Sequence, residues 1–249
     1  MAINYRSEEE IEKIRRANSI VVAAHKRLEE ILKPGISTKQ LDREAETVIL
    51  DLGGRPSFKG YRGFPNTLCV ALNNQVVHGI PDKTALKDGD IIGLDLGAEL
   101  EGYYGDAAQT LPVGEINEEA LKLIEVTKEA LMKGIEKMKP KAHLSDISHA
   151  IQQFAEENGY QVVRAFVGHG IGSKPHEDPQ VPNFGPPGRG PVLREGMVLA
   201  IEPMVNIGGS DVEVLDDQWT VRTADGTLSA HFEHSVAVVE DGFSILSEF

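Results

Sequence analysis

The chain has 249 residues, 41% of them hydrophobic and 26% charged, with a formal net charge of −14 at pH 7. This composition suffices for one sizeable hydrophobic core or two small domains. The acidic balance, without a basic stripe, argues against direct nucleic-acid binding, and no run approaches the roughly 18 apolar residues of a membrane span. The N-terminus lacks the apolar stretch of a signal peptide, and the single cysteine fits a reducing compartment, so we expect a cytoplasmic protein with no membrane partner.

Helix and strand patterns alternate along the chain. Ser7 followed by Glu10 is a capping box at the start of the first helix, and a Lys-Pro-Gly sequence ends it. The Pro/Gly-rich segment 179–191 interrupts a pattern rather than ending one, which predicts an ordered surface loop. The expected helices span residues 7–32, 38–52, 118–138 (capped by Asn117) and 146–158 (capped by Ser145 and closed by Gly159), and the expected strands span 67–72, 75–77, 90–100 and 103–111.

Two similar stretches indicate an internal repeat. LKDGDIIGLD begins at Leu86 and LREGMVLAIE at Leu193, an offset of 107, and the Lys-Pro pairs that begin at Lys33 and Lys139 are offset by 106. The acids that end the two stretches, Asp95 and Glu202, are also 107 residues apart. Gly-turn-strand junctions can look alike by chance, but three features at nearly one offset favour duplication. We therefore expect a single catalytic domain over 1–249, made of two related α/β halves at about 1–115 and 116–249.

Two aspartates stand in the paired strands of GLDLGAELEGYYGDAAQT. If the connecting turn has two residues, Asp95 and Asp106 share a face, with Cβ atoms roughly 5–8 Å apart. A three-residue turn would place them on opposite faces. Two partly buried carboxylates so close would force one to take a proton, unless a divalent cation binds both.

The second half supplies matching donors. Glu202 is the repeat counterpart of Asp95, and Glu233 lies in an apolar strand. His169 lies in GHGIG, where the glycines permit close backbone approach, and His176 follows in KPHEDP. Four carboxylates with one imidazole suit Mn²⁺, Fe²⁺ or Co²⁺ at least as well as Zn²⁺, and their charge suits two ions better than one.

Each residue taken singly has a plainer interpretation. A lone strand aspartate is more often solvated than a ligand, and His78 or His169 alone is more often a semi-buried structural histidine. Cys69 lies in an apolar strand, which is more typical of packing than of a nucleophile. By strand parity His234 points away from Glu233, so we expect it to be structural.

The ordered set of motifs resembles the type I, bacterial-type methionine aminopeptidases. The resemblance is carried by VVHGIP, LDLGAELEGYYGDAAQT, GHGIGSKPHEDPQVPN, LAIEPM and FEHSVAV, which together cover about residues 60–240. It implies the pita-bread α/β fold: two pseudo-symmetric halves around a central, largely antiparallel sheet with helices outside. It also implies a monomer acting on nascent polypeptide N-termini near the ribosome.

Site roles follow from the resemblance residue by residue. It implies two divalent ions (Co, Mn, Fe or Zn), with Asp106 and Glu233 bridging both. Glu202 would be both a ligand and the general base for a hydroxide held between the ions, while His78 and His176 would contact the substrate and take part in catalysis. The implied ligands are Asp95, Asp106, His169, Glu202 and Glu233, and the implied methionine pocket is Tyr61, Phe64, Cys69 and Trp219.

Two positions depart from the family pattern, and two alternative functions stay open. Arg62 stands where some relatives carry histidine, and Pro175 replaces a larger apolar residue. The family resemblance implies a preference for a small second substrate residue, and these two departures bear on that preference and not on the metal ligands. A proline-directed peptidase of the same fold is the nearest alternative enzyme, although such enzymes usually carry an extra N-terminal domain. A non-catalytic binding module of this fold would normally have lost ligands.

Overall fold

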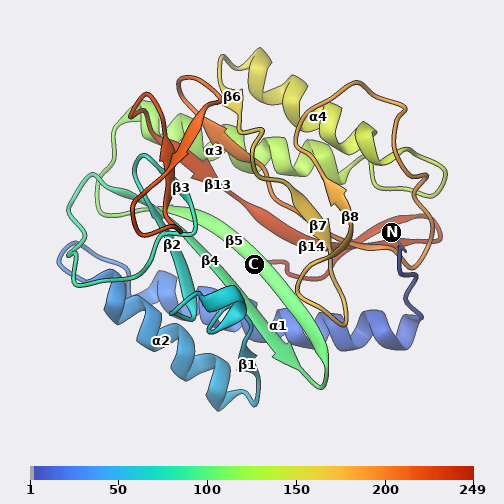
Figure 1. Cartoon of the computed structure of the whole chain (residues 1–249), viewed down its shortest axis with the longest axis horizontal. Helices are drawn as coiled ribbons and strands as arrows, with labels where there is room; N and C mark the ends of the chain where they lie inside the picture. The colour runs from blue at the N-terminus through green and yellow to red at the C-terminus, as the bar shows by residue number, and fades with distance from the viewer. Residues whose placement is uncertain (1–2) are drawn as a thin grey trace.

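A computed structural model describes residues 3–249 as a mixed α/β fold (Figure 1). The helical elements in this range are α1 (Glu8–Ile31), α2 (Thr38–Asp51), the 3₁₀ turn η1 (Tyr61–Gly63), α3 (Glu118–Ile135) and α4 (Leu144–Glu157). The strands of the first half are β1 (Arg55–Pro56), β2 (Leu68–Leu72), β3 (Gln75–Val77), β4 (Ile91–Leu100) and β5 (Tyr103–Pro112). Those of the second half are β6 (Gln161–Val162), β7 (Gly168–Gly170), β8 (Glu177–Val181), β9 (Val198–Ile201), β10 (Met204–Asn206), β11 (Val212–Val214), β12 (Val221–Thr223), β13 (Ser229–His231), β14 (Glu233–Val239) and β15 (Gly242–Ile245).

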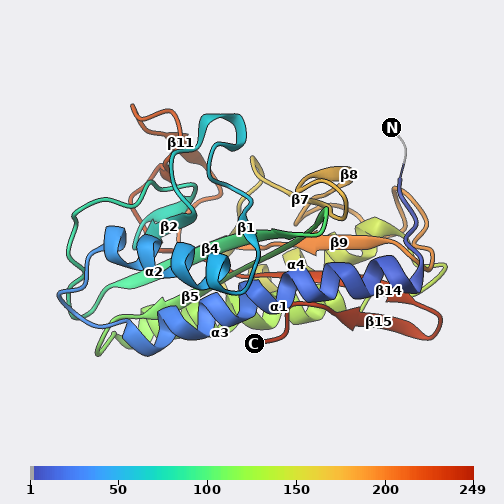
Figure 2. The same ribbon diagram turned by 90° about the horizontal axis from the view of Figure 1, so that it is seen from below.

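The main sheet crosses the whole molecule and carries strands from both halves. Its order is β1-β4-β5-β14-β9-β7-β8, with β2 also paired to β4 and β15 to β14. Helices α1, α3 and α4 lie on one side of the sheet in Figure 2, and β11, which belongs to a separate small sheet, lies toward the other. This arrangement confirms the expected fold class, with an antiparallel central sheet and helices outside.

Both helices of the first half begin at capping boxes, of which the one at Ser7 was expected from the sequence. Ser7 Oγ accepts the amide N–H of Glu10, whose carboxylate accepts the N–H of Ser7 in return. Ser37 and Gln40 form the same capping box on α2. These reciprocal bonds satisfy amide groups that have no partner inside the helix, so the helix starts are fixed locally.

In the second half, the start of helix α4 and the end of helix α3 differ from the predicted positions. Helix α4 begins at Leu144 rather than 146, because His143 occupies the N-cap position and its amide donates to the Asp146 carboxylate at 2.8 Å. Ser145 is therefore inside the helix, where its hydroxyl accepts the amide N–H of Arg189. Helix α3 is capped by Asn117 as expected, but it ends at Ile135 and not at 138.

The segment 179–191 was expected to be a loop throughout, and its first part is instead a strand. Residues up to Val181 belong to β8, which pairs with β7 and so extends the main sheet. The remainder is an ordered loop held to α4, where Gly185 and Gly188 donate their amides to Gln152 and Asp146. The prediction was therefore right for 182–191 only.

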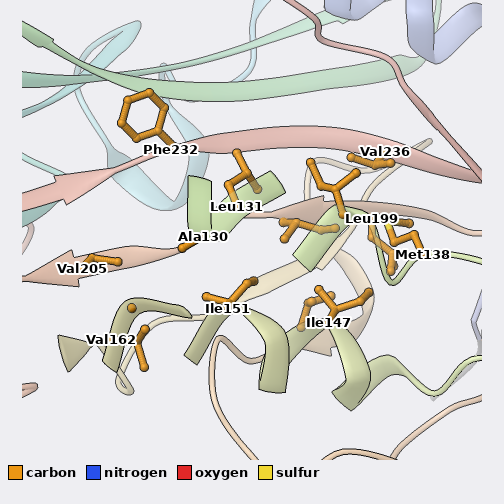
Figure 3. Close-up of a cluster of buried hydrophobic side chains, with 14 of the residues drawn as sticks. Ala130, Leu131, Met138, Ile147, Ile151, Val162, Leu199, Val205, Phe232 and Val236 are labelled. Atoms are coloured by element: carbon orange, nitrogen blue, oxygen red, sulfur yellow. The ribbon is translucent and has the colours of Figure 1, made fainter. Parts of the chain in front are cut away.

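Two hydrophobic cores fasten the helices to the sheet. One packs α1 and α2 against β2, β4 and β5. The other lies between α3, α4 and the strands of the second half; Figure 3 shows Ala130 and Leu131 of α3 and Ile147 and Ile151 of α4 with Leu199 of β9. The sheet is thus held rigidly from its helix side, which leaves its other face to position functional side chains.

Equivalent backbone contacts recur in the two halves. The amide of Leu86 donates to Ile36 O, and the amide of Leu193 donates to Ala142 O. Isolated β-bridges join Ser37 to Ala85 and His143 to Val192. In each half, the N-cap residue of the second helix (α2 or α4) therefore pairs with the loop that precedes a main-sheet strand (β4 or β9). The offsets of 106 and 107 seen in the sequence therefore recur as equivalent contacts, which supports the division into two halves that we propose.

Candidate metal centre

A two-residue turn sets the relation between the two aspartates. Leu100 pairs with Tyr103, so the turn is Glu101-Gly102, and both of its residues have positive φ as a type I′ turn requires. Asp95 lies opposite Ala108, and Asp106 lies two residues from Ala108 on the same strand. Because side chains alternate along a strand, both carboxylates project from one face, as predicted.

Ala108 lies at the centre of a row of paired residues that crosses the sheet. Cys69 of β2 pairs with Asp95 of β4, Asp95 with Ala108 of β5, and Ala108 with Glu233 of β14. Paired residues in antiparallel strands project to the same face, and the alanine methyl leaves space between its two acidic neighbours. The register alone therefore brings a carboxylate of the second half beside the two aspartates of the first.

His169 and Glu202 enter the site from the neighbouring strands. His169 is the central residue of β7, and Glu202 directly follows β9 rather than lying within it. The His169 Nδ1 atom lies 2.9 Å from Gly170 O, which fixes Nδ1 as the donor and leaves Nε2 to face Glu202 Oε1 at 3.5 Å. Asn183 donates its side-chain amide to Glu202 O and so fixes the backbone of that residue.

Three of the predicted ligands form a compact group. One donor atom each from Asp106, His169 and Glu233 lies within 4.8 Å of the other two, and all three residues are buried. Asp95 and Glu202 line the same cavity, although they are not part of this tightest group. The fold thus brings all five residues that were predicted to be metal ligands, from both halves of the chain, to one cavity.

Burial raises the pKa of each carboxylic acid in the cluster, and repulsion between the acids adds to this for all but Asp95. Burial raises the pKa of Asp95 to about 7, and it also raises those of Asp106, Glu202 and Glu233, each increased further by the negative charge of neighbouring acids. Without a counter-charge these groups could not all ionise at neutral pH. Their arrangement is therefore unfavourable for the fold by itself and suited to binding positive charge.

The polar atoms of the cluster fit a divalent cation. Asp95 Oδ1, Asp106 Oδ1 and Glu233 Oε1 are buried and accept no hydrogen bond from any residue in the described range 3–249. A buried carboxylate oxygen without a donor is costly unless it is protonated or binds a metal. Burial also lowers the pKa of His169 to about 4, which keeps its imidazole neutral and able to ligate.

An apolar pocket adjoins the carboxylates. Phe58, Phe64 and Cys69 form a buried cluster, with Trp219 packed against it and in edge contact with Phe64 at 5.1 Å between ring centroids. These residues and Tyr61 line the same cavity of about 140 Å³ as the acids. An engineered apolar cavity of about 150 Å³ holds a benzene molecule, so this space suits one medium-sized side chain.

His78 and His176 also line this cavity. His78 has a φ of 61°, unusual for a residue other than glycine, and its ring lies 5.5 Å from that of Phe166. The His176 ring stacks on Tyr61 at 5.1 Å and lies 4.2 Å from the His169 ring. Partial burial, then the neighbouring His169 and Arg62, lower the pKa of His176, so its imidazole is neutral near pH 7.

Sequence reasoning missed two residues at the site, His231 and Phe58. His231 Nε2 is buried, lies 3.9 Å from Glu202 Oε2 and has no hydrogen-bond partner within residues 3–249. Phe58 lines the cavity, as does Arg62, which the sequence had singled out as a departure from the family pattern. For His231 the available signal was its spacing of two residues from Glu233, since residues two apart in an extended segment project to the same side. His234 was expected to be structural and to point away from Glu233, and its Nδ1 lies 3.0 Å from Ser247 Oγ.

A buried ion pair holds the loop that carries His176. The Glu177 carboxylate accepts hydrogen bonds from Arg6 Nη2 at 2.6 Å, from Asn4 Nδ2 at 2.7 Å and from the amide of Lys174 at 3.1 Å. Burial by itself would raise the pKa of Glu177, but the bonds from Asn4 and Arg6 outweigh it and lower that pKa. The N-terminal segment is thereby bound to the residue next to His176.

Replacing Arg6 with alanine is expected to lower the free energy of unfolding near pH 7 by about 1–2 kcal/mol, between the values for exposed and buried pairs. Because the native pKa of Glu177 is depressed, this stabilisation is complete above the ordinary value of 4.5 and is lost as the pH falls through the lower native value. Urea unfolding of both proteins from pH 7 to pH 3 should show the difference shrinking. Arg16→Ala, which removes an exposed pair with Glu101, is the control; a pH-independent loss for Arg6→Ala would contradict the assignment.

Acidic oxygens, a neutral imidazole and an adjoining substrate-sized pocket together define a metal-dependent hydrolase. The model of metallopeptidase family M24 matches residues 12–240 of the sequence. The chain belongs to this metallopeptidase family.

Relatives with a methionine aminopeptidase name match nearly the whole chain. Methionine aminopeptidase 1 of Bacillus subtilis (strain 168) is 55% identical over 234 residues, which are 94% of this chain and 94% of that protein. The crystal structure of methionine aminopeptidase from Thermotoga maritima has a TM-score of 0.98 and 44% identity, and the match covers 100% of both chains. These likenesses bear out the resemblance given by the sequence motifs.

A prolidase shares the fold. The prolidase from Pyrococcus furiosus matches with a TM-score of 0.81 and 24% identity over 98% of this chain and 65% of that one. At this identity the likeness shows the pita-bread fold alone. No helix within residues 3–249 is both long and apolar enough to cross a membrane.

Proposed function

We propose that the protein is a methionine aminopeptidase, which removes the N-terminal methionine of newly made proteins and peptides and favours a small second residue. The observation that carries this proposal is the buried group of Asp106, His169 and Glu233 beside a pocket lined by Phe64, Cys69 and aromatic neighbours. Sulfur–aromatic contacts favour a methionine side chain in such a pocket. The 55% identity to the Bacillus subtilis enzyme supports the same activity.

The carboxylates and His169 would hold the divalent cations, two of them in our proposal. Such ions lower the pKa of a coordinated water toward neutrality and polarise a carbonyl group. The oxygens without hydrogen-bond donors are the positions expected to bind, because the described residues give them no other partner. The proposed ligands are Asp95, Asp106, His169, Glu202 and Glu233.

Three residues would carry out the proton and charge steps. Glu202 would act as general base, since it faces both His169 and His231 across the cavity and its burial raises its proton affinity. His176 would donate its ring N–H to the carbonyl oxygen as negative charge develops there. His78, which also lines the cavity, would contact the peptide on the leaving-group side.

The acidic cluster also accounts for action at a free N-terminus. An unprotonated substrate amino group can bind a metal ion held by these carboxylates, and a protonated one is attracted to the carboxylates themselves. A blocked amine such as formylmethionine loses that interaction. Since nascent chains are the proposed substrates, we place the protein in the cytoplasm.

Release of free methionine from Met-Ala-Ser is the test. We expect chelation to abolish release, and Mn²⁺, Co²⁺, Fe²⁺ or Zn²⁺ added back to restore it, with the bound metal measured alongside. Formyl-Met-Ala-Ser should resist hydrolysis. Faster cleavage of an Xaa-Pro peptide would instead favour a proline-directed peptidase, and metal binding without hydrolysis of either peptide would favour a binding module.

A further inference from the structure

The substrate cavity is too small for more than the first part of a peptide. Its volume of about 140 Å³ suits one side chain and the reacting peptide bond. A second hollow of about 490 Å³ adjoins it and shares three lining residues with it: Arg62, His169 and His176. The two hollows therefore meet at these three side chains.

Arg62 lies at the junction and is held in an unusual conformation. It has a φ of 50° between Gly60 and Gly63, and a side chain at positive φ costs on the order of 1 kcal/mol or more. Its guanidinium lies 5.4 Å from the centroid of the Tyr61 ring, which in turn stacks on His176. The strained turn thus presents a cation at the rim of the cavity, next to a residue that we place at the reacting carbonyl.

The charges of the hollow leave a positive excess. Arg62 and Lys174 are exposed and form no ion pair within the described part of the chain. The acid Glu177, which also lines the hollow, is already paired with Arg6. Asp178 is the one remaining acid among the lining residues, so two cations face one anion.

We propose that this hollow is a binding subsite for the substrate residues after the second one, and that Arg62 and Lys174 make the enzyme favour an acidic side chain at the third position. This inference rests on the proposed function and adds a determinant of substrate choice. A carboxylate there would lie near an exposed guanidinium, and a lysine would be repelled by it. An exposed ion pair gives a modest preference, which is weakened by salt.

The test compares Met-Ala-Glu-Ser, Met-Ala-Gln-Ser and Met-Ala-Lys-Ser at low ionic strength. We expect kcat/KM to fall in that order, by about fivefold from the Glu to the Lys peptide, mainly through KM. In Arg62→Gln the Glu-to-Lys ratio should fall toward one, and Lys174→Gln should lower it by a smaller factor. Because the ratio is taken within one variant, a general loss of activity cancels.

Lys137→Gln is the matched control, since it removes the same charge from an exposed residue shortly after α3 that does not line the hollow, and it should leave the ratio unchanged. Equal rates for the Glu and Lys peptides, or a ratio that Arg62→Gln does not change, would overturn this inference and leave the proposed function standing. Failure to release methionine from any of the three peptides would overturn the proposed function itself.

Discussion

Replacing Asp106 with asparagine is expected to abolish methionine release and to remove at least one bound divalent ion. The side chain keeps its size, but it loses the negative charge that completes the group with His169 and Glu233. Metal ions contribute several kcal/mol to the stabilisation of a hydrolytic transition state, so kcat/KM should fall at least about a thousandfold.

The fold should survive this change, because the backbone of Asp106 is held independently of its carboxylate. The amide N–H of Asp106 donates to Asn18 Oδ1 at 3.2 Å, and its carbonyl oxygen accepts a hydrogen bond from the Ser235 hydroxyl at 2.8 Å. Neither bond involves the carboxylate. Removing one of several neighbouring like charges should leave the metal-free variant at least as stable as the metal-free wild type.

Thermal unfolding with and without metal separates the two effects. Wild type should gain stability on metal addition because the ions bind only the folded state, and Asp106→Asn should gain much less. Asp51→Asn, at the exposed end of α2, removes an equal charge and should behave as wild type. Near-normal hydrolysis with full metal content in Asp106→Asn would show that Asp106 is not a ligand.

Local features of the fold were predictable from the sequence where one short segment determines them. The capping box of Ser7 and Glu10 and the turn at Glu101-Gly102 each depend on a few neighbouring residues. The turn length then fixed the shared face of Asp95 and Asp106 through strand parity. The start of α4 was missed because histidine is not a preferred N-cap residue, and here Asp146 supplies the hydrogen bond.

The assembly of the site depends on strand order, which local patterns do not contain. Glu233 lies beside the aspartates because β14 pairs with β5 at Ala108, more than a hundred residues away in the chain. The internal repeat and the motif order pointed to this convergence, but the places of His231 and Phe58 became visible only in three dimensions. Phe58 lines the cavity and His231 lies beside Glu202 through long-range packing and not through a recognisable motif.

Replacing His176 with alanine is expected to lower kcat by about 10²–10³-fold, the typical cost of removing one hydrogen-bond donor to a developing oxyanion. The bound metal should remain, since the carboxylates and His169 are contributed by other strands. KM should change less than kcat, because the proposed hydrogen bond strengthens as negative charge develops in the transition state.

The His176 ring is held in place by its stacking on Tyr61 and by the Arg6–Glu177 ion pair at the next residue. The contribution of His176 to kcat should therefore depend on an N–H donor at that position. His176→Asn retains a donor and should recover part of the lost turnover, whereas an alanine in place of His149 on α4 should have no effect. Loss of metal from His176→Ala would make His176 a ligand. An unchanged kcat would assign the oxyanion contact to another group, and His231, whose Nε2 lies 3.9 Å from Glu202 Oε2, would be the next imidazole to test.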